Sequence, residues 1–218
     1  MKFKVWIIVG FWIVGIVVAK LSPNENIASW FRAVVPMDLR SQNARLIEDQ
    51  WNFIGSAETE RILRACMRNR DTYCEMLGFK KLHELDNRDE GYLANYAIRL
   101  NQLKRHREAV ATFKKLQSRA PLTYDSWSYL GMSYEAMGKD QKAIRAYREA
   151  LKIYPYIVDI SERLSDLYIK NRDFKSAQEF LERQSKAMPR MKANFKRRLQ
   201  RVQELQVKEL NSKSGNQS

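Results

Sequence analysis

A pattern of large and small residues that returns every 34 positions limits how this chain can fold more than any other feature. The clearest copy spans 124–157 and contains, in order, Trp127, Leu130, Gly131, Tyr134, Ala143, Tyr147, Ala150 and Pro155. Shifted by 34 residues without a gap, 90–123 and 158–191 carry residues of the same kinds, among them Leu93, Ala97, Ala109, Phe113, Pro121, Leu164, Ser165, Ala177, Leu181 and Pro189. Such a period is typical of stacked supersecondary units, none of which buries its apolar face alone.

The spacing inside one copy predicts two antiparallel helices. Leu130 and Tyr134 recur at helical spacing, and so do Ala143 and Tyr147. A turn is predicted at 138–140, and Pro155 is expected to end the second helix. The small residues of the pattern would let the two helices approach closely.

Composition excludes the main alternatives to a helical stack. The 218 residues include only 8 Gly and 5 Pro, too few for the frequent turns of a β-sandwich or barrel. The 5 Trp, 10 Tyr and 9 Phe exclude general disorder, because disordered chains use few aromatic residues. Two Cys cannot form a disulfide framework or a four-Cys zinc site.

The pattern in 124–157 resembles that of the tetratricopeptide repeat family, with Tyr147 at the position of the family's Phe. The resemblance implies an all-α fold, an α-solenoid of helix-turn-helix units at 90–123, 124–157 and 158–191. We interpret 56–89 as a degenerate preceding unit, because Glu75 and Asn87 stand where Ala and Pro are expected. Residues 192–210 are predicted to form a C-terminal capping helix, and 211–218 a disordered tail.

Residues 1–22 predict a transmembrane signal-anchor or a cleaved signal peptide ahead of the solenoid, with a buried core helix as a third alternative. Fifteen uncharged residues run from Val5 to Ala19 between Lys4 and Lys20. At about 1.5 Å per residue they span about 23 Å, short of a bilayer core of about 30 Å, so an anchor needs snorkelling lysines.

Both membrane interpretations predict the same topology, with a cytoplasmic N-terminus and a translocated body. The anchor predicts a single-pass inner-membrane protein with a periplasmic body, whereas cleavage predicts a periplasmic or secreted protein. Residues 23–55 would then form juxtamembrane or linker helices. Cys66 and Cys74 flank the predicted turn of 56–89, so a disulfide is possible in an oxidising compartment, and two free buried thiols are the alternative.

The family resemblance also implies that the first helix of each unit lines a concave groove for a partner peptide or helix. The implied groove residues are Asn95, Ile98, Asn101, Asp125, Ser128, Tyr129, Met132, Glu135, Asp159, Glu162, Arg163 and Asp166. Apolar and acidic side chains predict a partner segment with basic and apolar residues. The alternative is that the acids only balance basic neighbours.

No phosphate-binding loop, histidine metal cluster or catalytic motif stands out, so neither a cofactor nor catalysis is expected. The predicted function is a membrane-tethered, non-catalytic scaffold that helps to assemble an envelope complex. The net charge of +14 leaves an alternative, a soluble exported or cytosolic repeat protein whose basic surface binds nucleic acid or anionic lipid. The basic residues of the chain lie mainly in 183–203 and in the predicted second helices, for example Arg145, Arg148 and Lys152.

Overall fold

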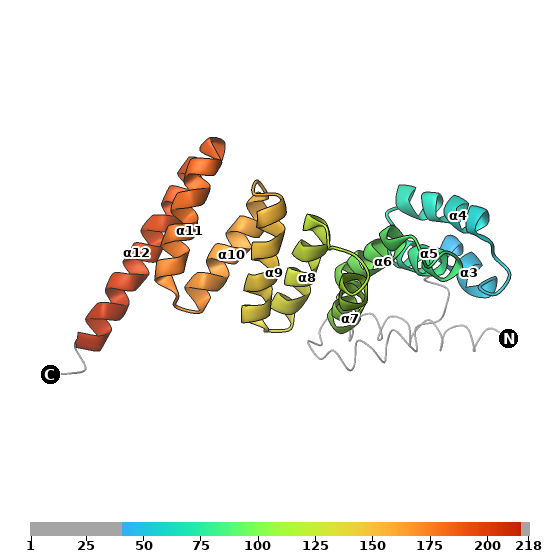
Figure 1. Ribbon diagram of the computed structural model, residues 1–218, viewed down its shortest axis with the longest axis horizontal. Helices are drawn as coiled ribbons and strands as arrows, with labels where there is room; N and C mark the ends of the chain where they lie inside the picture. The colour runs from blue at the N-terminus through green and yellow to red at the C-terminus, as the bar shows by residue number, and fades with distance from the viewer. Residues whose placement is uncertain (1–40, 215–218) are drawn as a thin grey trace, which may run out of the picture.

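The computed structural model describes residues 41–214, and this part of the chain is helical, with ten α-helices, one 3-10 helix and no strand (Figure 1). The predicted all-α solenoid is confirmed over this range, whereas the predicted N-terminal membrane helix lies outside the described residues. Among residues 41–214, no helix combines the length and the hydropathy that crossing a bilayer requires. The helices are α3 (Gln42–Asp49), α4 (Ser56–Arg68), α5 (Thr72–Leu85), α6 (Glu90–Gln102), α7 (His106–Gln117), α8 (Tyr124–Ala136), α9 (Asp140–Ile153), α10 (Val158–Lys170), α11 (Phe174–Ala187), η2 (Pro189–Met191) and α12 (Lys192–Ser214).

Eight of these helices form four pairs whose bounds repeat with the 34-residue period. We call the pairs α4/α5, α6/α7, α8/α9 and α10/α11 the first to fourth units. Their first helices begin at Ser56, Glu90, Tyr124 and Val158, each 34 residues after the one before. The units follow one another along an elongated stack, with α3 near one end and α12 at the other (Figure 1).

The two helices of every unit are joined by the same left-handed turn. One residue in each turn has a φ between 54° and 69°, and these residues are again 34 positions apart: Arg70, Lys104, Gly138 and Arg172. The N–H of the next residue donates to a first-helix carbonyl five positions earlier, for example Lys139 to Tyr134 at 2.9 Å. This closure satisfies carbonyl groups at the end of the first helix.

These turns should differ in stability, because only glycine adopts a positive φ without steric cost. Lys104→Gly is expected to raise the free energy of unfolding by about 0.5–1 kcal/mol, and Gly138→Ala to lower it by about 1 kcal/mol. A β-carbon on Gly138 would have no heavy atom within 4 Å, so this substitution changes the backbone preference alone. Urea unfolding followed by circular dichroism measures both effects, and a Gly138→Ala midpoint equal to that of the wild type would contradict the expectation.

Packing inside the third unit depends on a glycine opposite a tyrosine. A β-carbon on Gly131 would lie 2.5 Å from the ring of Tyr147, whose side chain is fully buried. The second unit has Ala97 and Phe113 at the same two positions, both completely buried. A small residue on the first helix thus makes room for a large one on the second.

The first unit departs from this arrangement on its first helix. Leu63 stands where the second and third units have Ala97 and Gly131. It packs on Gly78 of α5, where a β-carbon would lie 3.0 Å from Leu63 Cδ1. Phe79 keeps the large position of Phe113 and Tyr147, and the small residue that accommodates Leu63 is Gly78, one position before it. The repeat pattern is therefore hard to see in 56–89, although the helix pair is present.

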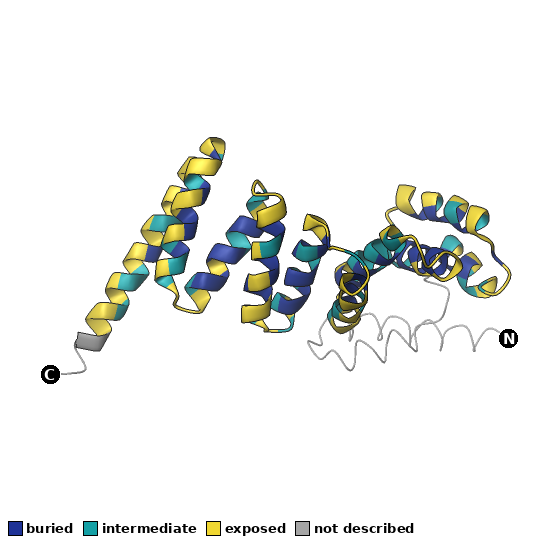
Figure 2. Ribbon diagram, in the orientation of Figure 1, coloured by how far each residue is buried: buried dark blue, intermediate teal, exposed yellow. Residues whose placement is uncertain are grey.

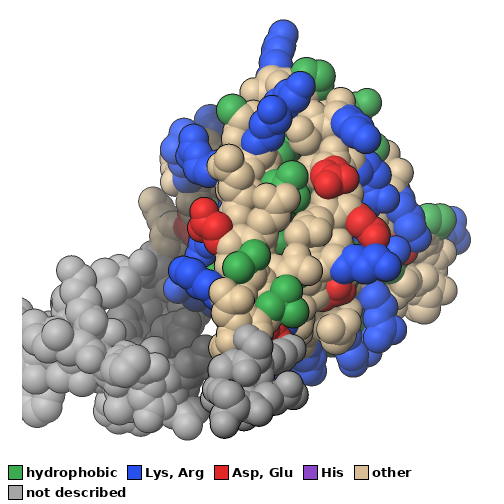
Figure 3. Space-filling model, turned by 90° about the vertical axis from the view of Figure 1, so that its left-hand side faces the viewer, with side chains coloured by type: hydrophobic (Ala, Val, Ile, Leu, Met, Phe, Trp, Pro, Cys, Tyr) green, Lys and Arg blue, Asp and Glu red, His purple; other side chains and the backbone are tan. Residues whose placement is uncertain are grey.

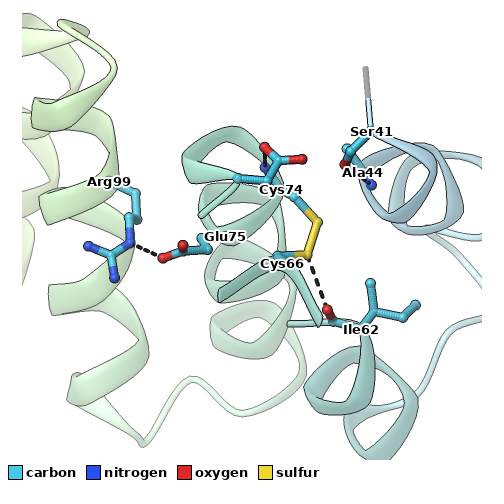
Figure 4. Close-up of a disulfide and its surroundings, with 8 residues drawn as sticks. Ser41, Ala44, Ile62, Cys66, Cys74, Glu75 and Arg99 are labelled. Atoms are coloured by element: carbon cyan, nitrogen blue, oxygen red, sulfur yellow. Dashed lines mark hydrogen bonds and ion pairs between the residues drawn. A yellow bond between two sulfur atoms is a disulfide. The ribbon is translucent and has the colours of Figure 1, made fainter. Parts of the chain in front are cut away.

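Two side-chain links stabilise the first unit (Figure 4). A disulfide joins Cys66 of α4 to Cys74 of α5, with 5.7 Å between the Cα atoms and both side chains buried. On the next residue, Glu75 Oε2 lies 2.5 Å from Arg99 Nε of α6 in a largely buried ion pair. Glu75 occupies the position that holds Ala109 and Ala143 in the following two units, so the ion pair replaces a small-residue contact.

The N-terminal end of the stack is covered by α3 and the loop after it. Tyr73 of α5 donates its hydroxyl to Glu48 at 2.7 Å. The buried Lys81 donates its ammonium to the carbonyl of Trp51 and lies over the indole ring of that residue, 5.2 Å from its centroid. These contacts attach residues just before the first unit to its second helix.

The C-terminal end is covered by α12. Phe195 and Val202 are completely buried, and the buried side of α12 faces α11 (Figure 2). The prediction of a disordered tail from residue 211 is wrong in its first part, because α12 continues to Ser214. Glu209 pairs with Arg172 of the fourth unit at 3.4 Å, and within α12 its carbonyl accepts the Ser212 hydroxyl at 2.8 Å.

Candidate functional site

All twelve groove residues implied by the sequence lie on α6, α8 and α10, and we call the surface that these helices share the first-helix surface. Its apolar part consists of Ile98, Tyr129 and Met132, which are half-buried and pack against the core. Asn95 is also half-buried, and its side-chain amide donates to the Gly91 carbonyl at 2.9 Å. Three apolar side chains are therefore partly exposed on neighbouring helices.

Two of the implied contact residues are buried instead. Asn101 is 8% exposed, and its amide donates to the Tyr129 carbonyl at 3.2 Å and to Ser133 Oγ at 2.7 Å. Ser128 is 5% exposed, and its hydroxyl donates to the Tyr124 carbonyl at 2.8 Å. This corrects the sequence-based expectation for both residues: Asn101 fixes α6 against α8 and so positions Tyr129, and neither side chain faces a partner.

Glu135 near the end of α8 and Asp159 at the start of α10 are held by one arginine. Arg163 Nη1 donates to Glu135 Oε2 and its Nε to Asp159 Oδ2, each at 3.2 Å. The Tyr147 hydroxyl donates to the same Glu135 oxygen at 2.5 Å. Burial, followed by the hydrogen bond to Glu135, raises the pKa of Tyr147 above its ordinary value, so this hydroxyl stays protonated as a donor. The four side chains form one network between α8, α9 and α10.

A second arginine comes from α12, for which the sequence predicted a capping helix or a basic binding surface and no contact with the acidic residues of α10. Arg198 Nη1 donates to Asp166 Oδ1 at 2.7 Å, and its Nη2 lies 3.6 Å from Glu162 Oε2. Asn194, one turn earlier, donates its amide to Glu162 Oε1 at 2.8 Å. The four-residue spacing of Asn194 and Arg198 places both on one face of α12, and this is the signal that could have indicated the contact.

These ion pairs change the predicted character of the surface. An arginine partner is present for each of Glu135, Asp159, Glu162 and Asp166. These acids therefore balance basic neighbours, which is the alternative that the sequence left open. Asp125 is exposed and forms no ion pair within residues 41–212. The partly exposed side chains of Ile98, Tyr129 and Met132, which we call the apolar strip, are then the part of the surface that is available to a partner, rather than the acidic charge.

The other basic residues of 183–203 lie towards the C-terminal end of the stack. Figure 3 shows this end, where Lys and Arg side chains gather around a face that carries few acidic and apolar ones. Lys196, Arg197 and Arg201 of α12 are exposed. A charged outer face is what a terminal helix of a repeat stack needs for solubility.

Comparison with known proteins decides the family. A family model described as tetratricopeptide repeat matches residues 124–157, which are the third unit. This chain is a tetratricopeptide-repeat protein. No curated protein sequence matches it.

Solved structures share the fold of this tetratricopeptide-repeat protein at low sequence identity. YrrB, described as a TPR protein with an unusual peptide-binding site, is 11% identical with a TM-score of 0.59, over 77% of this chain and 85% of YrrB. One MamA structure is 15% identical with a TM-score of 0.53, over 70% of this chain and 94% of MamA. A second MamA structure is 14% identical with a TM-score of 0.52, over 76% and 87% of the two chains. Likeness at these identities is evidence for the fold alone.

Proposed function

We propose that this tetratricopeptide-repeat protein is a non-catalytic scaffold that binds a peptide or helix of a partner protein on its first-helix surface. The observation that carries the proposal is the partly exposed apolar strip of Ile98, Tyr129 and Met132. Because Asn101 and the Arg163 network hold the three helices together, this strip is preorganised and loses little conformational entropy on binding. The peptide-binding site named for YrrB supports the same kind of use.

The partner segment is chiefly apolar in this proposal. Four acids of the surface are paired with Arg163 or Arg198, so they offer little uncompensated charge. Asp125 is the acid that a basic residue of the partner can meet without breaking an ion pair within the described part of the chain. The basic character expected of the partner is thereby reduced to a secondary role.

The proposal includes a location. We place the protein in the inner (cytoplasmic) membrane, tethered through residues 1–22, with the repeat body in the periplasm, where it serves the assembly of an envelope complex. The apolar run between Lys4 and Lys20 supports the tether. The disulfide between Cys66 and Cys74 supports export of the body, since disulfides persist in oxidising compartments.

The tether predicts that the full-length chain stays in the membrane pellet after carbonate washing. A single-pass anchor resists this treatment because its apolar segment remains in the bilayer, whereas a peripheral protein is released. Immunoblotting of pellet and supernatant measures the distribution. Release of a mature form that begins near Lys20 would instead support the cleaved signal peptide.

Met132→Glu tests the binding surface. The substitution places an unpaired carboxylate in the apolar strip, and loss of an interface anchor typically costs about 2 kcal/mol or more of binding free energy. We expect partners that co-purify with the tagged full-length chain from detergent-solubilised membranes to be largely lost. Met67→Glu is the matched control, because Met67 is 49% exposed on α4, outside the surface. Circular dichroism should show equal helix content in both variants.

Three further measurements separate the alternatives. Asp125→Asn should weaken capture less than Met132→Glu, and mainly at low salt, as expected for a rim charge. If Met132→Glu has no effect while replacing Arg197 and Arg201 by Gln abolishes capture, the C-terminal basic face is the binding site. Binding of nucleic acid or anionic lipid that falls steeply with salt would favour the alternative function.

A further inference from the structure

A pocket of about 450 Å³ lies between α9 and α11, the second helices of the third and fourth units. Its floor is apolar and includes Leu164 and Phe180, which are 1% and 4% exposed. At roughly 100° per residue, Leu164 lies about 140–160° around α10 from Asp159 and Asp166. The pocket therefore opens on the side of the stack opposite to the first-helix surface, and we call it the second-helix pocket.

The rim of the second-helix pocket is basic. Arg148 and Lys152 of α9 and Arg183 of α11 line it, and no acidic residue does. Lys152 pairs with Glu149 at 2.6 Å, whereas Arg148 and Arg183 form no ion pair within residues 41–212. Two arginines from different helices thus stand over an apolar floor without a carboxylate partner, and the guanidinium of Arg183 lies over the Phe180 ring, 5.8 Å from its centroid.

A buried polar atom lies in the lining of the same pocket. Gln184 is 5% exposed, and its Oε1 has no hydrogen-bond partner among the described residues. Buried polar side-chain atoms are nearly always hydrogen-bonded, so an unpaired acceptor in a pocket indicates a missing donor. Oε1 is enclosed in the free chain, so a peptide backbone N–H can supply this donor once the Gln184 side chain turns towards the pocket, whereas the hydrocarbon part of a fatty acid cannot.

Exposed aromatic side chains extend from the pocket towards α8. Tyr156 lines the pocket and is 56% exposed, and its ring centroid lies 5.8 Å from that of Tyr154 in an edge-on contact. Tyr154 in turn lies 5.3 Å from Tyr124 at the start of α8. Exposed tyrosines next to arginines are enriched in protein–protein interfaces.

We infer that the second-helix pocket binds an acidic peptide segment of a partner protein, independently of the first-helix surface. One large apolar side chain of the segment fills the pocket above Leu164 and Phe180. Its carboxylates pair with Arg148 and Arg183, and a backbone N–H donates to Gln184 Oε1. Charge complementarity selects an acidic segment, since the lining holds three basic residues and no acid.

Fluorescence anisotropy with the full chain in phosphatidylcholine nanodiscs tests this inference. The probe is a labelled acidic peptide with one central phenylalanine, and a matched peptide has serine in its place. We expect saturable binding of the first peptide and Kd values at least about tenfold higher for the serine peptide and for the Arg148→Gln/Arg183→Gln variant. Arg145→Gln/Lys186→Gln is the matched control, because it removes one exposed basic residue from each of the same helices outside the pocket.

Gln184→Leu separates a binding role from a structural one. It removes a buried unpaired acceptor, so the melting temperature should be unchanged or higher while the peptide binds more weakly. Met132→Glu should leave peptide affinity unchanged, so failure here is distinguishable from failure of the proposed function. The inference would be overturned if no saturable binding is seen, or if the Arg148/Arg183 and control variants bind the peptide with equal affinity. It would also be overturned if phosphatidylglycerol vesicles, but not phosphatidylcholine vesicles, displace the peptide.

Discussion

Glu75→Ala is expected to lower the free energy of unfolding by about 3 kcal/mol or more, although alanine is the residue that the repeat pattern places at this position. Glu75 is 7% exposed and pairs with Arg99 of the second unit at 2.5 Å. Without the carboxylate, the largely buried guanidinium of Arg99 would have no counter-charge. Urea unfolding of the full-length chain, followed by circular dichroism, measures the loss.

The control for this prediction is Arg99→Met on the Glu75→Ala background. Arg99 lies over the ring of Phe79, 5.8 Å from its centroid, and methionine can keep an apolar contact there without a charge. The double variant should recover most of the lost stability, and the double-mutant cycle gives the coupling energy of the pair. Should Glu75→Ala unfold at the same urea concentration as the wild type, the ion pair would contribute nothing measurable.

Removing the disulfide is expected to cost about 2–3 kcal/mol, which is the loop-closure entropy of a short cross-linked loop. Cys66 and Cys74 are eight residues apart, and the loop between them contains Arg70 with its positive φ. Cys66→Ala/Cys74→Ala should therefore destabilise the first unit, in which Leu63 and Gly78 already depart from the packing of the other units. Equilibrium urea unfolding under non-reducing conditions measures the difference from the wild type.

A reducing agent provides the matched control for the disulfide. It should lower the unfolding midpoint of the wild type to near that of the double-alanine variant, and it should leave the variant unchanged. A wild-type midpoint that does not respond to reductant, with reduction verified by thiol labelling of the unfolded chain, would show that the cross-link does not stabilise the unit.

The fold could be predicted from the sequence because its signals are local and repeated. Gly131 and Tyr147 stand 16 positions apart within one unit, and their sizes fit only when the two helices are antiparallel and close. The same signal is weak in 56–89, where Leu63 stands at the small position and Gly78, next to the large position, makes room for it. Nothing in the one-dimensional pattern shows that this substitution preserves the packing.

The candidate site could be predicted only in its location. The family resemblance, applied in the 34-residue register, implies a groove lined by Ile98, Tyr129 and Met132 on first helices, and the structure leaves all three partly exposed. The burial of Asn101 and the ion pairs of the acidic residues could not be predicted. Asn101 depends on Ser133, 32 positions away, and the acids other than Asp159 depend on arginines 28 to 36 positions away, such as Arg198 for Glu162.

The sequence by itself determined the 34-residue period and the helix pairs, since each follows from residue size, helical spacing and turn residues within a single unit. The tertiary structure alone decided which charges are paired and which remain free. Lys, Arg, Asp and Glu side chains are long and flexible, and each helix surface offers several partners at similar cost. Only the stacking of neighbouring units brings Arg163 to Glu135 and Arg198 to Asp166 while leaving Arg148 and Arg183 beside an apolar pocket.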